Sequence, residues 1–144
     1  MFRQDYLMRL VQQLAEAIRR ISGLNRSGHH DAALAAADQQ WGELLDAPRA
    51  LIDAVDTPTL AAMLRDPAKL RAAAKLCHEE GRALAGKDCP AHAQRRYRRA
   101  LELMLELRAV EPGGDGASDD AAAILELSRL VPSDLLDPRY TAAR

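Results

Sequence analysis

The stretch from Pro67 to Leu107 reads PAKLRAAAKLCHEEGRALAGKDCPAHAQRRYRRALELMLEL, and it decides the fold. Apolar and small residues recur at three- and four-residue steps on both sides of a short Gly-Lys-Asp break, which predicts two helices. Gly81 stands inside the first helix, where a glycine costs about 1 kcal/mol relative to alanine. Ala93, Tyr97 and Ala100 form a stripe on the second. Close approach of the helices would justify the glycine, so we predict a tightly packed antiparallel hairpin.

The composition favours helices throughout the chain. Of 144 residues, 48% are hydrophobic but only 3% are aromatic. The apolar volume therefore comes mainly from Ala and Leu, which are strong helix formers. A chain of this length suits one domain and can bury enough surface to fold without a covalent or metal staple. We predict an all-α fold of about six or seven helices in antiparallel pairs.

Start and stop signals place the expected elements along the chain. Helices are predicted over residues 2–22, 29–46, 67–85, 90–110 and 118–130, and two short elements begin at Pro48 and at Thr57, with Thr57 as a helix cap. A single helical domain would span residues 1–131, with a glycine-rich loop at 111–117. Residues 132–144 are expected to form a tail that docks in part through Leu135, Leu136 and Tyr140.

Charge and cysteine content narrow the setting of the protein. The net charge is -1, so no global attraction to nucleic acid or anionic lipid is expected. Two cysteines do not make a disulfide framework, which fits a reducing compartment. The N-terminus lacks a signal-peptide core, and no run approaches the roughly 20 apolar residues of a membrane span. We expect a cytoplasmic protein without membrane contact.

The central hairpin resembles a tetratricopeptide repeat (TPR). The family has small, aromatic and leucine residues at a fixed spacing. The residues at the matching positions here are Gly81, Ala93, Tyr97, Ala100 and Leu101. The sequence departs from the family pattern at Cys77, Pro90 and Leu105, and a second partial match at Gly28, Ala33 and Leu34 lies about sixty residues earlier rather than one period away. The resemblance implies a degenerate, TPR-like right-handed array and a role in protein–protein interaction.

The opening block resembles the start of a family of uncharacterised bacterial proteins. It reads FRQDYLMRLV from Phe2 to Val11, around an Asp-Tyr-Leu-Met-Arg core. That resemblance implies a bacterial origin and a TPR-like fold. It implies no activity and no catalytic residues.

Four arginines on the second helix of the hairpin are the candidate partner-binding residues. They are Arg95, Arg96, Arg98 and Arg99, and Arg95, Arg98 and Arg99 are expected on the side of the helix opposite Tyr97. Ion pairing of Arg98 or Arg99 with Glu102 on a solvated face is the favoured explanation, and an acidic protein partner is the alternative. Nucleic-acid binding through phosphate contacts is the weaker interpretation, since few aromatic residues accompany them.

Other motifs do not predict chemistry. Gly81 to Asp88 nearly spells a phosphate-binding P-loop, but Asp88 replaces the Ser or Thr that holds magnesium, and the residues before it continue a helix. Cys77, His78, Cys89 and His92 form the sole metal-like cluster of the sequence. Cys77 is roughly 15 Å along the helix from the turn, so a shared zinc ion is hard to build. We expect a buried Cys77, surface histidines, no cofactor and no enzymatic activity.

The leading functional hypothesis is therefore a TPR-like protein–protein interaction scaffold, with a groove lined by the first helix of each pair. The alternative is a self-associating, homodimeric structural protein that uses the leucine-rich end from Leu103 to Leu107 or the first helix. A zinc-binding or nucleic-acid-binding role comes third.

Overall fold

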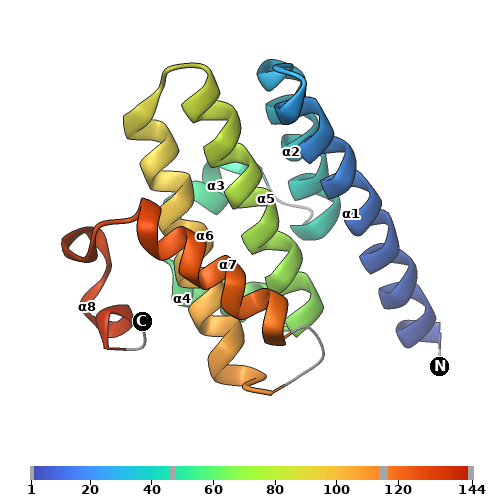
Figure 1. Cartoon of the computed structure of the whole chain (residues 1–144). Coiled ribbons are helices and arrows are strands. Elements are labelled where there is room, and N and C mark those ends of the chain that lie inside the picture. The colour runs from blue at the N-terminus through green and yellow to red at the C-terminus, as the bar shows by residue number, and fades with distance from the viewer. Residues whose placement is uncertain (1, 46–47, 114–116, 143–144) are drawn as a thin grey trace.

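The computed structural model describes residues 2–45, 48–113 and 117–142, and every regular element in these residues is a helix (Figure 1). The all-α prediction is confirmed. The elements are α1 (Phe2–Arg26), α2 (His30–Leu45), α3 (Arg49–Ala54), α4 (Thr57–Leu64), α5 (Pro67–Gly86), α6 (Pro90–Val110), α7 (Ala117–Leu130), the 3-10 turn η1 (Ser133–Leu135) and α8 (Pro138–Thr141). The expected loop at 111–117 and the expected end of α2 at Asp46 fall in part on residues outside the described ranges.

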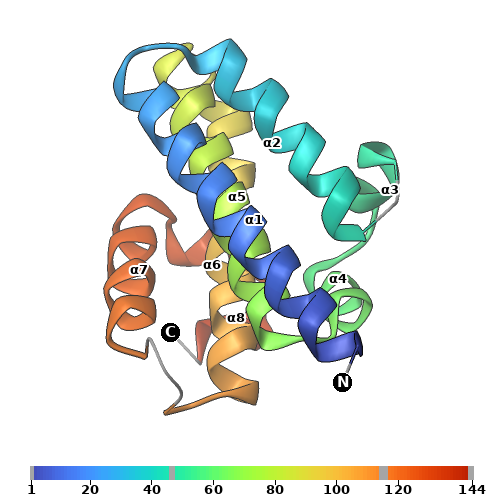
Figure 2. The same cartoon turned by 90° about the vertical axis from the view of Figure 1, so that its right-hand side faces the viewer.

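Helix α5 lies at the centre of the molecule. It forms one antiparallel hairpin with α6 and packs against both helices of the other hairpin, α1 and α2. Helix α7 packs on α6, and the short helices α3 and α4 connect the two hairpins (Figures 1 and 2). Because α5 has neighbours on most of its circumference, even Glu79 and Glu80 are buried in it.

Close packing of the central hairpin depends on Gly81, as predicted. A Cβ atom at this position would lie 2.5–2.6 Å from ring atoms of Tyr97. The ring in turn makes an edge-to-face contact with His78, at 5.9 Å between centroids. Glycine thus lets an aromatic side chain fill the space between two helix backbones.

The two hairpin turns place one glycine and one non-glycine residue in the left-handed region. Helix α1 continues to Arg26, beyond the expected end at Ser22, and the left-handed residue that follows is Gly28, at φ 81°. In the α5–α6 turn the left-handed position is Asp88, at φ 65°. Gly86 instead meets the ring of His30, which a Cβ atom would overlap. The absence of a side chain at Gly86 therefore makes room for His30 and lets the two hairpins come into contact.

The helix start at α4 corrects one prediction. The capping side chain is Asp56, whose carboxylate accepts a hydrogen bond of 2.9 Å from the Thr59 amide. Thr57 is buried instead, and its hydroxyl donates to Glu102 at 2.6 Å. Asp66 caps α5 before Pro67, and its carboxylate accepts a hydrogen bond from the Ala68 amide. Both caps satisfy amide groups that a helix start leaves without partners.

The leucine-rich end of α6 belongs to the core of this chain. Its leucines at 101, 103, 105 and 107 are each no more than 3% exposed. Leu136 and Tyr140 of the C-terminal tail are also buried, whereas Leu135 is 45% exposed. Leu103 and Leu105 are therefore not available as a surface for a second copy. No helix in the described ranges is both long and apolar enough to span a membrane.

Candidate functional site

The four predicted arginines line one cavity of about 390 Å³, which we call the arginine pocket. It lies between α2, α3, α5 and α6, and its other lining residues are Leu34, Asp38, Asp53, Glu80, Leu84 and His92. The arginines do not all face solvent as expected: Arg95 and Arg98 are exposed, but Arg96 and Arg99 are partly buried.

Spacing along α6 explains this placement. His92, Arg95, Arg96 and Arg99 stand at i, i+3, i+4 and i+7, and such residues share one face of a helix. That face borders the arginine pocket, whose other lining residues come from α2, α3 and α5. The periodicity of the sequence indicates the helix face, but it does not identify the helices that form the rest of the pocket.

One lining residue of the pocket, Glu80, forms an ion pair with the partly buried Arg49. Glu80, 2% exposed, binds Arg49 through two hydrogen bonds of 2.6 and 2.8 Å and accepts a third, of 3.3 Å, from the Trp41 indole. The Arg49 guanidinium also lies over the Trp41 ring, 4.8 Å from its centroid. Burial acts to lower the pKa of Arg49, but the hydrogen bond and charge of Glu80 raise it above its ordinary value. The pair ties α2, α3 and α5 together.

A second ion pair closes the side formed by α3. Asp53 accepts hydrogen bonds from Arg96 at 2.7 and 3.3 Å and from Arg49 at 3.1 Å. Burial acts to raise the pKa of Asp53, but the two guanidinium groups hold it below its ordinary value. The carboxylate is therefore ionised near neutral pH, and it anchors α3 to α6.

Three arginines keep donors that the protein does not satisfy. Arg99 donates one bond of 2.6 Å to the Val55 carbonyl through Nη2, while its Nη1 is buried without a hydrogen-bond partner. Arg95 has no ion-pair partner among the described residues, and Arg98 reaches Glu102 only at 4.0 Å. A buried donor without a partner costs about 1–3 kcal/mol, and more when it is charged. This cost applies to Arg99 Nη1, whereas the donors of Arg95 and Arg98 are exposed and can bind water or an anion.

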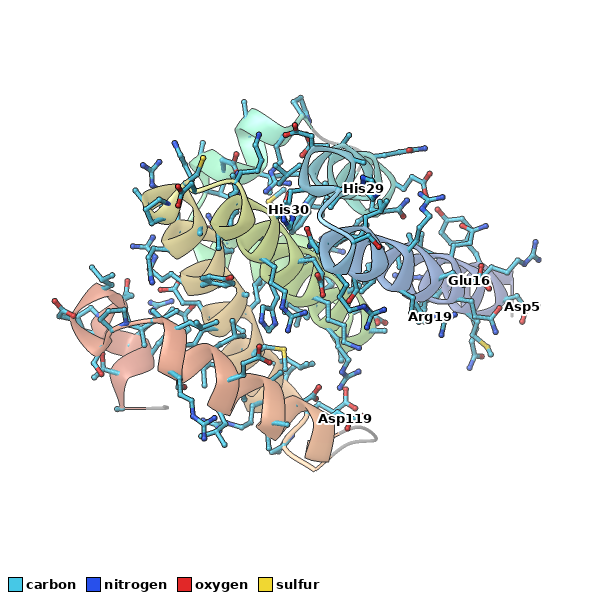
Figure 3. The ribbon with its side chains drawn as sticks, turned by 45° about the horizontal axis from the view of Figure 1, so that its top comes forward. Asp5, Glu16, Arg19, His29, His30 and Asp119 are labelled. Carbon is cyan, nitrogen blue, oxygen red and sulfur yellow. The ribbon has the colours of Figure 1, made fainter. Side chains whose placement is uncertain are left out.

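A second hollow, the α1–α5 groove, lies elsewhere on the molecule. Its volume is about 220 Å³, and its lining residues are Val11, Leu14, Ala15, Ile18, Arg19, Ala68, Arg71, Ala72 and Lys75. Arg71 binds Asp120 of α7 at 2.9 and 3.0 Å, so α7 is fixed beside the groove. In Figure 3, α1 and α7 lie on either side of α5, and Arg19 lies on the outer surface of α1.

The Cys/His cluster is not assembled. Cys77 is buried, and burial raises the pKa of its thiol to about 12. His78 is 8% exposed, which corrects the expectation that it lies on the surface, and burial lowers its pKa. Its Nε2 lies 3.5 Å from Glu126 of α7. Among the described residues, no three His, Cys, Asp or Glu side chains are grouped so that they could hold a metal ion.

The near P-loop is helical, because residues 81–86 belong to α5.

Comparison of the chain with protein-family models, with curated proteins and with solved structures finds no match in any of the three. The geometry of the two hollows is therefore the basis for a functional assignment.

Proposed function

We propose that this protein is a non-enzymatic protein–protein interaction scaffold with a TPR-like right-handed array. Three features support the proposal: α1–α2 and α5–α6 form successive antiparallel hairpins, α5 packs against both helices of the preceding pair, and α7 follows as the first helix of an incomplete third pair. The contact of Gly81 with Tyr97 occupies the position where the family resemblance places its small and aromatic residues. Helices α3 and α4 would be an irregular insertion between two units.

The α1–α5 groove carries the proposal. It is lined by first helices of the two pairs, its centre is apolar at Val11, Ala15 and Ile18, and Arg19 and Lys75 lie at its border. Neither of these two cations has an ion-pair partner among the described residues. A partner segment with apolar side chains flanked by Asp or Glu would complement this surface.

Selection of short random peptides on the immobilised full chain tests this function. We expect the selected peptides to combine apolar residues with Asp or Glu, and Ala15→Trp to weaken their binding at least about tenfold, or about 1.4 kcal/mol, by filling the groove. Ala35→Trp is the matched control, since Ala35 is an exposed alanine of α2 outside the groove. Equal loss in both variants would contradict the assignment.

Charge reversal gives an independent check. Lys75 is exposed, so Lys75→Glu should leave the fold intact. The variant should bind the acidic peptides more weakly and lose part of the salt dependence of binding, because exposed charges are screened by salt. Unchanged binding would show that the peptides occupy another surface.

A further inference from the structure

The arginine pocket has features that the scaffold proposal does not use. It shares no lining residue with the α1–α5 groove. Its three carboxylates, Asp38, Asp53 and Glu80, are already engaged by Arg49 or Arg96. Arg95, Arg98 and Arg99 remain, so the cationic groups without full partners lie on one face of the cavity.

The surroundings of these arginines restrict what could satisfy them. The buried Nη1 of Arg99 has no acceptor, although the other end of the same guanidinium is held by the Val55 carbonyl. Glu102, the carboxylate nearest to Arg98, already accepts the Thr57 hydroxyl at 2.6 Å. Side chains of the protein therefore do not supply the acceptor that this face lacks, and a bound anion would.

We propose that the arginine pocket binds a phosphate group carried by an organic molecule. A phosphate monoester has three acceptor oxygens and nearly two negative charges at neutral pH, whereas a carboxylate has two oxygens and one charge. One guanidinium fork satisfies one carboxylate, so three guanidinium groups around one cavity match the larger acceptor set of a phosphate. Arg95, Arg98 and Arg99 make these contacts, and Arg96 keeps its bonds to Asp53.

The size and lining of the pocket indicate that the phosphate is not bound alone. Its volume of about 390 Å³ falls within the range of small-molecule sites, roughly 300–1,000 Å³. Leu34 of α2 and Leu84 of α5 form an apolar part of the wall. The phosphate group meets the arginines, and the apolar part of the ester contacts the leucines.

Titration of the full chain, followed by calorimetry and by NMR amide shifts, tests the proposal. The probes are inorganic phosphate, a nucleoside monophosphate and a short phosphoserine peptide, with the same peptide carrying Glu as the carboxylate control. Arg95→Gln and Arg98→Gln should each weaken phosphate binding at least about tenfold. Both side chains are exposed, so circular dichroism should show an unchanged fold. Arg129→Gln, on an exposed position of α7, is the matched control.

The pattern of binding identifies the source of the phosphate. Preference for the phosphoserine peptide indicates a modified protein segment, and preference for the nucleotide indicates a small metabolite. Both outcomes support the proposal, whereas binding of inorganic phosphate as tight as that of the two esters overturns it, because the organic part would then make no contact that contributes to affinity. Equal affinity for the Glu peptide, no saturable binding, or binding that survives the Arg95→Gln/Arg98→Gln double variant overturns it. Failure of the phosphate proposal would not contradict the proposed peptide binding in the α1–α5 groove, because the peptide selection tests different residues.

Discussion

Gly81 and Tyr97 show how a chain with few aromatic residues obtains a dense core. The glycine removes a side chain from α5 so that one ring fits between α5 and α6. Tyr97 is 7% exposed and contacts the ring of His78 on its edge. Its position is therefore fixed from two sides, and it has little freedom to make room for an added methyl group.

Gly81→Ala should lower the free energy of unfolding although alanine is the better helix former. Overpacking costs about 1–3 kcal/mol, and the gain in helix propensity is about 1 kcal/mol, so we expect a net loss of up to about 2 kcal/mol. Gly42→Ala is the control: a methyl group added to this helical glycine would meet no atom within 4 Å, so the variant should be about 0.5–1 kcal/mol more stable. Urea unfolding measures both, and stabilisation by Gly81→Ala would refute the packing argument.

Among the helices, α7 is attached to the central hairpin by polar contacts at several points. Arg71 of α5 binds Asp120 and Arg82 binds Glu126 at 3.0 Å, while Gln94 of α6 donates to the Leu130 carbonyl at 2.7 Å. Ile124, Leu127 and Val131 supply the buried apolar side. His78 lies beneath this helix, close to Glu126. The attachment of α7 therefore combines a small apolar contact with groups that titrate.

The stability of the protein should fall as the pH decreases below about 7 because of His78. Burial, assisted by the charge of Arg82, lowers the pKa of His78 below 6.5 despite the opposing effects of Glu126 and Glu79. The unfolded chain therefore binds a proton before the folded chain does, so the stabilisation present above about pH 6.5 is lost as the pH decreases.

His78→Gln should remove this pH dependence, while His92→Gln, at an exposed position, should retain it. Urea unfolding at several pH values measures the slope. Loss of stability confined to lower pH, where the Asp53 and Glu126 carboxylates with their lowered pKa values become protonated, would assign the effect to the ion pairs and not to His78.

On the scale of the whole molecule, α5 and α6 should form the most stable unit. Their contacts join neighbouring segments of sequence, and α5 is covered by α1, α2 and α6 together. The first turns of α1 are less well covered, since Tyr6 and Met8 are 66% and 57% exposed. Amide hydrogen exchange should therefore be slowest in α5 and α6 and fastest at the start of α1. Stronger protection in α1 than in α5 would contradict this order.

The long helices were predictable because their signals are local. Apolar periodicity, Pro at helix starts and Gly near their ends placed α5 and α6 almost to the residue, and Gly81 identified the close contact. The cap of α4 was assigned to Thr57 because threonine is a common capping residue. Its hydroxyl is instead used by Glu102, which lies 45 residues further along the chain.

The arginine pocket was predictable only in part for the same reason. The spacing of Arg95, Arg96 and Arg99 defines a helix face, but the partners that turn this face into a pocket are Asp53 of α3 and Glu80 of α5. The bonds of Arg49 to Glu80 span 31 residues, and the bonds of Arg96 to Asp53 span 43. Such pairs depend on how the two hairpins pack against each other, and the local sequence does not specify this packing.

Trp41 gives the molecule a built-in optical probe. It is the sole tryptophan of the chain, it is 1% exposed, and it contacts both members of the Arg49–Glu80 pair. Its fluorescence therefore comes from one known place, the junction below the arginine pocket, and an indole shielded from water emits at shorter wavelength than a hydrated one. A ligand that binds to the arginines should change the intensity of this emission without shifting it to the wavelength of the unfolded chain. The same signal can thus separate binding from unfolding without an attached dye.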